Sequence, residues 1–415
     1  MAVTCGKVAN VLPAAEGARA AIPKTAKPYL YAEGTDVNHL ITPDGKSGTH
    51  ICFGEGTGTQ SWSWSAATSP IPSAQRIVSI VRSAESYLVS DGKGSICRLS
   101  ASEEPPHKKN KRDNGTSHAS SEKEYMWEEI VSASQTPSGD GSGTDSFAAL
   151  FAKTSYGGPG WSGLARALNP SHLVNSRQYY GDVRLVDVEQ KSVVRSYGTS
   201  HPSTGIVDFT QSNTQELLHC VLVAEGCLAT LYDVRCASAV LTLDEVRSVA
   251  EDESLRERLG GHIGPAVPGR LTSTSGRISD VCALPTASSA WEGHEVVLAI
   301  DRAVCVYDVR KFTKQFTSSN VLKYVVNSVA LTANGTEVVC SGIDSEVRVI
   351  PIQRSKEKVK PQKGSEDDGA LGGTFRTRID SSMACETSWC GGWVTSENGV
   401  SAIGLSTANE VFIAK

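Results

Sequence analysis

The sequence predicts an all-β fold that is built from a repeated unit of short strands. Residues 326–352 contain three short apolar segments separated by two tight turns, which is typical of a small antiparallel sheet. The same kind of ending recurs at 231–235 and 306–310, where Tyr-Asp-Val-Arg closes an apolar segment. The 415 residues include 38 glycines and are 39% hydrophobic, as expected of a β-rich chain with many turns.

The best-defined unit has strands at 326–331, 338–341 and 347–350. Asn334-Gly335 is a turn pair that tolerates positive φ, and Asp344 is a turn acid whose short carboxylate can hydrogen-bond its own backbone. From Tyr307 to Ile350 is 43 residues, and from Val186 in a weaker copy at 185–188 to Tyr232 is 46. From Tyr232 to Tyr307 is 75 residues, which indicates an insertion between these two units.

A unit of three or four strands that recurs every 40–45 residues or so resembles the WD-repeat family. The endings at 231–235 and 306–310 are similar to the family's Leu-Trp-Asp-Leu-Arg, with tyrosine in place of tryptophan. Residues 326–352 depart from the pattern at Ile350 and Pro351, where the family has its Trp-Asp pair. The resemblance implies an all-β, seven-bladed WD-repeat β-propeller, and the alternative is an all-β sandwich of unrelated strands.

The resemblance divides the chain into a flexible N-terminus at 1–26 and one propeller at 27–415. A strand at 27–32 is expected to complete the last blade and so close the ring. The expected blades are 36–74, 75–131, 146–200, 206–243, 278–317, 323–352, and 381–415 together with 27–32. Three loop insertions interrupt them, at 103–123, 244–277 and 353–380.

Taken in order, the strands follow from short apolar runs between turn residues. The predicted strands after the closing one are 36–40, 49–54, 60–64, 76–81, 87–90, 95–99, 125–131, 146–151, 171–175, 183–188, 206–210, 217–223, 228–233, 239–243, 278–284, 295–300, 304–309, 326–331, 338–341, 347–350, 381–386, 391–395, 400–405 and 409–415. Insertion 103–123 has no aliphatic side chain larger than alanine, so we expect it to be disordered.

Charge and cysteine content limit the classes of partner and the compartment. The net charge of −5 gives no bulk attraction to nucleic acid, and no apolar run approaches the length of a membrane span. The eleven cysteines lie largely within strand patterns and indicate a reducing compartment. We therefore expect a cytoplasmic or nuclear protein with protein partners, without membrane contact and without nucleic acid. An alanine-rich N-terminus leaves a mitochondrial transit peptide as the alternative.

Chemistry-bearing motifs do not point to an enzyme. The sequence has no Gly-x-Ser-x-Gly nucleophile elbow, and its nine histidines show no metal-ligand spacing. The glycine-rich segments at 54–58 and 139–143 lack the strand–turn–helix context of a dinucleotide site. We therefore predict a non-enzymatic scaffold without cofactor or metal, which binds other proteins inside a larger complex.

Four residues carry the only partner information in the pattern: Asp233, Arg235, Asp308 and Arg310. An arginine two residues after the aspartate, on neighbouring blades, resembles the motif of substrate receptors that dock on the cullin-4 ubiquitin ligase adaptor. That role is the alternative function. The opposite interpretation is that each aspartate holds its arginine in a structural ion pair.

Two further sets of residues have predicted roles. Asp301 and Asp344 are expected to be structural turn acids between the second and third strands of their blades. The basic run Lys108, Lys109, Lys111 and Arg112 predicts a nuclear-import signal, with a nucleic-acid contact and solvated loop charge as the alternatives.

Overall fold

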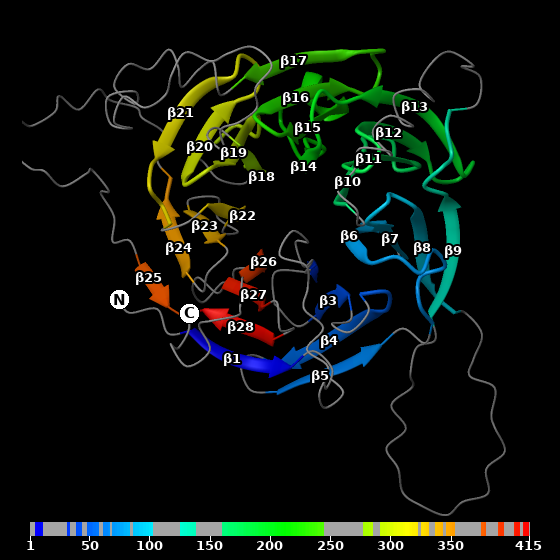
Figure 1. Cartoon of the computed structure of the whole chain (residues 1–415), viewed down its shortest axis with the longest axis horizontal. Helices are drawn as coiled ribbons and strands as arrows, with labels where there is room; N and C mark the ends of the chain where they lie inside the picture. The colour runs from blue at the N-terminus through cyan, green and yellow to red at the C-terminus, as the bar shows by residue number, and fades with distance from the viewer. Residues whose placement is uncertain are drawn as a thin grey trace, which may run out of the picture.

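The described residues form a ring of seven antiparallel four-stranded sheets (Figure 1). The structure is a computed structural model, and it describes residues 5–10, 31–33, 39–43, 48–57, 61–66, 69–83, 86–102, 125–137, 160–244, 277–284, 291–322, 325–331, 337–342, 346–352, 375–378, 389–393, 402–406 and 410–414. Each sheet is one blade, with its first strand near the centre of the ring and its fourth at the circumference. The predicted all-β propeller is thus confirmed, and the seven sheets agree with the predicted number of blades.

Blades 1 to 4 use consecutive strands. Blade 1 contains β2 (Tyr31–Glu33), β3 (His39–Pro43), β4 (Ile51–Thr57) and β5 (Ser61–Ala66). Blade 2 contains β6 (Ile77–Ser83), β7 (Ser86–Asp91), β8 (Ile96–Ala101) and β9 (Tyr125–Val131). Blade 3 contains β10 (Ser162–Arg166), β11 (His172–Arg177), β12 (Asp182–Asp187) and β13 (Ser192–Gly198). Blade 4 contains β14 (Ser203–Asp208), the 3₁₀ helix η1 (Gln215–His219), β15 (Cys220–Glu225), β16 (Leu228–Asp233) and β17 (Ala239–Asp244).

Blades 5 and 6 repeat this order, and blade 7 closes the ring. Blade 5 contains β18 (Ile278–Ala283), β19 (Glu295–Ile300), β20 (Ala303–Asp308) and β21 (Thr313–Ser318). Blade 6 contains β22 (Val326–Leu331), β23 (Glu337–Gly342), β24 (Glu346–Pro351) and β25 (Phe375–Arg378). Blade 7 contains β26 (Trp389–Trp393), β27 (Ala402–Ser406), β28 (Glu410–Ala414) and β1 (Cys5–Asn10).

An N-terminal strand does close the last blade, but it is not the predicted one. β1 pairs antiparallel with β28 from Cys5 opposite Ala414 to Asn10 opposite Glu410, so the N-terminus is not flexible throughout 1–26. The prediction that 27–32 supplies this closing strand is wrong, because the end of that segment belongs to blade 1. Tyr31 pairs with Ile41 in the innermost hairpin of that blade. Pairing of the two chain ends covers an edge of β28 that would otherwise be open.

Two other boundaries differ from the prediction. Residues 375–378 were assigned to the insertion at 353–380, but they form β25, where Phe375 pairs with Val349. The chain thus returns from its insertion to complete blade 6. In blade 3 the innermost strand is β10, which includes part of a glycine-rich passage, whereas 146–151 lies outside the described residues.

Several expectations fall on residues outside the description. They are the insertion at 103–123 with its basic run Lys108, Lys109, Lys111 and Arg112, the interior of the insertion at 244–277, and the turn acid Asp344. Within the described residues, no helix has the length and apolar character that a membrane crossing requires.

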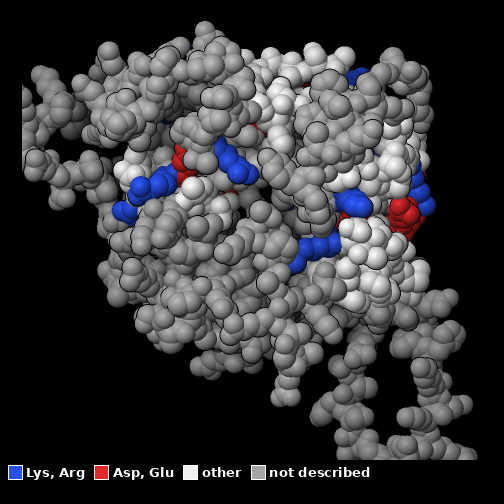
Figure 2. All heavy atoms as spheres, viewed as in Figure 1, with Lys and Arg blue, Asp and Glu red and all other residues white. Residues whose placement is uncertain are grey.

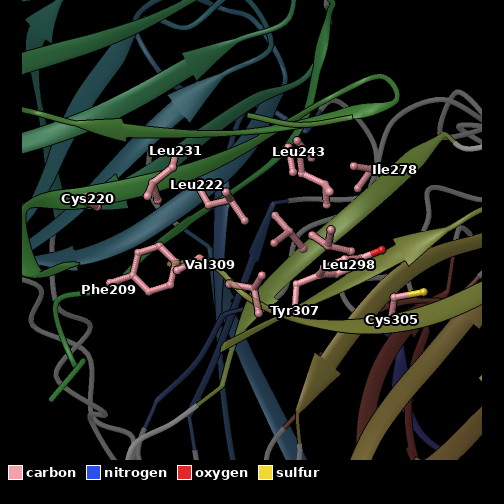
Figure 3. Packing of buried hydrophobic residues seen from close by; sticks show 14 of the residues in the cluster. Phe209, Cys220, Leu222, Leu231, Leu243, Ile278, Leu298, Cys305, Tyr307 and Val309 are labelled. Atoms are coloured by element: carbon pink, nitrogen blue, oxygen red, sulfur yellow. The ribbon is translucent and has the colours of Figure 1, made fainter. Parts of the chain in front are cut away.

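The hydrophobic core lies between neighbouring blades. Blades 4 and 5 share one cluster, in which Leu222 and Leu231 face Leu298 and Tyr307 across the boundary (Figure 3). All six residues of β19 are buried, because a central strand of a blade is covered by the blades on both sides. Burial on both faces explains why apolar residues fill this strand without alternation.

Candidate protein-interaction site

The third strands of blades 3, 4 and 5 all end on an aspartate: Asp187, Asp233 and Asp308. Because the blades share one strand order, these three ends lie on the same face of the ring. We call this set the Asp rim; it comprises the three aspartates and the second residue after each, namely Glu189, Arg235 and Arg310. In every case the aspartate Oδ1 accepts the backbone N–H of that second residue, at 2.9 to 3.0 Å. The rim is therefore made of three copies of one turn.

Blades 4 and 5 add a side-chain pair to the turn. The Nε of Arg235 donates to Asp233 Oδ1 at 2.9 Å, and its Nη2 donates to Asp233 Oδ2 at 2.6 Å. Arg310 repeats this with Asp308, at 3.0 Å and 2.7 Å. Two parallel N–H···O bonds fix the plane of a guanidinium, which a lysine cannot reproduce. The structure thus brings the predicted residues together in two matching bidentate pairs.

The two halves of each pair differ in exposure. The Asp233 and Asp308 side chains are 11% and 9% exposed, whereas those of Arg235 and Arg310 are 54% and 45% exposed. The hydrogen bond from Arg235 holds the pKa of Asp233 below its usual range. Burial raises the pKa of Asp308, but the bonds from Arg310 outweigh it and the pKa is lowered. Each aspartate is therefore an ionised anchor, and each guanidinium presents its outer N–H groups to solvent.

The turn acid Asp301 has a backbone role on the opposite face. It lies between β19 and β20 at a φ of +50°, in the left-handed region. Its N–H donates to the Arg277 carbonyl at 3.0 Å, and its carbonyl accepts the N–H of Val326 at 2.7 Å. Asp301 thus joins the first strands of blades 5 and 6 at this face.

Two histidines that the sequence pattern did not predict lie next to the Asp rim. His219 and His294 directly precede β15 and β19, and their carbonyls accept the N–H of Val234 and Val309, each at 3.0 Å. They therefore occupy the same position in blades 4 and 5. The one sequence signal is a histidine just before the second strand of two consecutive repeats, and it becomes meaningful only when the strand register is known.

Reactive groups are not evident in the described part of the chain. No set of three or more His, Cys, Asp or Glu side chains there is arranged to hold a metal ion. Burial raises the pKa of Cys97 and Cys220 to about 12, so both remain neutral thiols. Burial likewise raises the pKa of Cys282 and Cys340. These cysteines are small core residues.

Charge is divided among small groups on the face that Figure 2 shows. The lysine and arginine side chains of the described residues stand apart from one another, with acidic side chains next to some of them (Figure 2). The described residues that are visible on this face form no continuous basic surface of the kind that follows a phosphate backbone. Discrete charged groups of this kind are suited to contacts with individual side chains.

Comparison with known proteins shows the fold. No protein-family profile and no curated protein sequence matches the chain. Among solved structures, a chain of a mitotic checkpoint complex is similar with a TM-score of 0.53 and 9% identity, over 99% of this chain and 93% of that chain. Sqt1 of Chaetomium thermophilum, bound to the N-terminus of ribosomal protein L10, gives a TM-score of 0.52 and 11% identity, over 92% and 82%. The WD40 β-propeller domain of Doa1 gives 0.50 and 10%, over 92% and 90%. With seven four-stranded blades and these likenesses, the chain has the fold of a WD40 β-propeller.

Proposed function

We propose that the protein is a non-enzymatic scaffold that binds other proteins, and that blades 4 and 5 dock a partner through the Asp rim. The observation that carries this proposal is the pair of matching turns in which a buried aspartate fixes a half-exposed arginine. A guanidinium held in one orientation loses little freedom when it binds, so its remaining N–H groups are preorganised for an acceptor.

The chemistry of the rim favours a partner with carboxylates or backbone carbonyls. Within the described residues, the Nη1 groups of Arg235 and Arg310 make no hydrogen bond, although the Nε and Nη2 groups do. Two donors of the same geometry on neighbouring blades fit a segment that crosses from blade to blade. A likeness to Sqt1, which is bound to a peptide segment of a ribosomal protein, is compatible with this use of the fold.

A cullin-4 ubiquitin ligase adaptor is the specific partner that the two Tyr-Asp-x-Arg endings suggest. In this alternative, the protein is a substrate receptor of that ligase, and Arg235 and Arg310 contact the adaptor. Both arginines are about half exposed and lie on one face of the ring, which supports this alternative.

The test is affinity purification after crosslinking, with the double variant Arg235→Ala/Arg310→Ala compared with wild type. The matched control is Arg302→Ala, an arginine on the opposite face whose Nε donates to the Leu322 carbonyl at 3.0 Å. We expect a defined set of partners to be lost with the double variant and kept with the control, and a double Arg→Lys variant to behave like the alanine variant.

The composition of the lost set decides between the two functions. Loss of a cullin-4 adaptor identifies the substrate receptor, and loss of other proteins identifies a different complex. Recovery of the same partners by wild type and the double variant, with both folded, contradicts docking at the Asp rim. A large drop in thermal stability of the double variant would instead assign the arginines a structural role.

A further inference from the structure

His294 lies directly behind the Asp308–Arg310 pair, in the loop before β19. Its side chain is 1% exposed, so the ring is enclosed by protein. Its Nε2 is 3.3 Å from Glu295 Oε1, 3.5 Å from Asp308 Oδ2 and 3.6 Å from Glu292 Oε2. A proton bound at Nε2 therefore enters a group of three carboxyl oxygens.

Asp308 Oδ2 is shared between the histidine and the arginine. Arg310 Nη2 donates to this oxygen at 2.7 Å, while His294 Nε2 lies 3.5 Å from it on the buried side. A neutral imidazole whose single proton is on Nδ1 has no Nε2–H to donate, so it leaves this oxygen to the guanidinium. A charged imidazolium competes for the same oxygen and repels the guanidinium, because both are cations.

Blade 4 repeats the histidine, aspartate and arginine of this arrangement but differs in the residue opposite the aspartate and in the burial of the histidine. His219 occupies the position of His294, and Asp233 and Arg235 repeat the aspartate–arginine pair. The residue opposite Asp233 in the sheet is Cys220, whereas Glu295 is opposite Asp308. Burial keeps the Cys220 thiol neutral, so blade 4 lacks the fully buried carboxyl group that faces the histidine of blade 5. His219 is also only partly buried.

We propose that His294 is a proton sensor that controls the position of Arg310 on the Asp rim. When Nε2 takes up a proton from solvent, its N–H is shared between Asp308 Oδ2 and Glu295 Oε1. The Arg310 guanidinium then loses its bond from Nη2 and turns toward solvent, while the backbone N–H of Arg310 stays bound to Asp308 Oδ1. Histidine is the side chain that ordinarily changes its charge between pH 5 and 8, so this is the range in which to search for the switch.

The charged groups around the ring come from two segments. Glu292 and Glu295, in the ring's own loop and strand, attract the imidazolium, and so does Asp308 across the sheet. Arg310 repels it, and Lys311 and Lys314 follow on the exposed side, with Lys314 Nζ 5.5 Å from the centre of the Tyr307 ring. Three carboxyl groups thus face the ring against one adjacent guanidinium, which favours displacement of Arg310 over expulsion of the histidine.

The experiment is an NMR titration of the full-length, isotopically labelled protein from pH 8 to pH 5. It follows the His294 ring together with the Nε–H signals of Arg310 and Arg235, which are assigned with single Arg→Lys variants. We expect the Arg310 signal to change with the same midpoint as the His294 ring, and the Arg235 signal to change less. His294→Gln should abolish the Arg310 response, and the matched variant His219→Gln should leave it intact.

Three results would overturn the proposal. They are an Arg310 signal that stays constant while His294 titrates, a His294 ring that does not titrate between pH 5 and 8, and an unchanged Arg310 response in His294→Gln. Coincidence of the two midpoints in the wild type is decisive even if His294→Gln does not fold. The readout involves no partner, so it stands or falls separately from docking at the rim.

Discussion

The boundary between blades 2 and 3 differs from that between blades 4 and 5 in how it is held. Blades 4 and 5 meet through an apolar cluster that includes Leu222 and Leu298. Blades 2 and 3 also share apolar contacts, but a fully buried arginine, Arg184, crosses between them. Blades 4 and 5 also exchange hydrogen bonds, such as the one that Thr204 Oγ1 donates to the Ile278 carbonyl at 2.7 Å. The difference is that the bonds between blades 2 and 3 converge on one buried, charged side chain, so that boundary depends far more on single atoms.

Arg184 illustrates the demands of the polar boundary. Its Nη1 donates to the carbonyls of Ser132 and Gln135 at 3.1 and 3.2 Å, and its Nη2 donates to the Gly94 carbonyl and, at 3.0 Å, to Asn175 Oδ1. Burial, and then the neighbouring Arg177 charge, lower the pKa of Arg184 to about 9. The charge is therefore unfavourable here in itself, and it is tolerated because four acceptors surround it.

Arg184→Ala should have the largest effect on stability. The change removes the donor to the Gly94 carbonyl at a buried site and to the Ser132 and Gln135 carbonyls at a half-buried one, and it opens a cavity. We expect a loss of about 4 kcal/mol in the free energy of unfolding, measured by urea denaturation. Arg184→Met restores much of the volume but none of the donors, so it should recover only part of the loss. Stability within error of wild type for either variant would refute this account.

Leu298→Ala tests the apolar boundary, and its effect should be somewhat smaller. Leu298 is fully buried between blades 4 and 5, and truncation removes apolar contacts without leaving a polar group unpaired. We expect a loss of about 3 kcal/mol by the same measurement. Leu298→Met should restore most of it, because an apolar boundary accepts any side chain of similar volume. Equal losses of stability for Leu298→Ala and Leu298→Met would contradict this difference between the boundaries.

Gly94→Ala probes the polar boundary without removing any donor. Gly94 has a φ of +91°, and a Cβ there would lie 2.3 Å from Cδ and 2.7 Å from Cγ of Arg177. The strained backbone and the displaced arginine should together lower stability by about 2 kcal/mol. The effect should be smaller in an Arg177→Ala background, because the clash is then gone. Additive effects of the two changes in a double-mutant cycle would show that they do not act on each other.

The repeated strands could be predicted from the sequence because apolar runs, turn residues and the Tyr-Asp endings all have local signals. Cys5–Asn10 and Phe375–Arg378 could not, since each becomes a strand only through a partner far away in the chain, β28 and β24. The histidines could not be predicted either, because His294 approaches Asp308 only through the pairing of β19 with β20, which sequence spacing does not reveal. Arg184 had a weak signal, as an arginine within the apolar run Val183 to Val186.

The exposed ion pairs around Glu128, at the outer end of the boundary between blades 2 and 3, should contribute least to stability. Glu128 on β9 is 41% exposed and accepts from Lys191 Nζ at 2.7 Å, and its Oε2 lies 3.2 Å from Arg98 Nη1. The same Arg98 also reaches Glu189 on the Asp rim, at 2.9 Å. Glu128, Glu189 and Lys191 are at least 41% exposed and Arg98 is 24% exposed, so solvent screens this network, whereas Arg184 is fully buried.

Glu128→Gln should therefore lower the free energy of unfolding by less than about 1 kcal/mol at pH 7. The hydrogen bond from Lys191 lowers the pKa of Glu128 below its ordinary 4.5, so the folded state holds this proton less tightly than the unfolded state. The difference between wild type and variant should be fully present above pH 4.5 and should disappear as the pH falls through the lower folded value. It should also shrink at about 1 M NaCl, where the Debye length is about 3 Å. A loss as large as that of Arg184→Ala, or one indifferent to salt, would mean that exposure does not separate the two ends of this boundary.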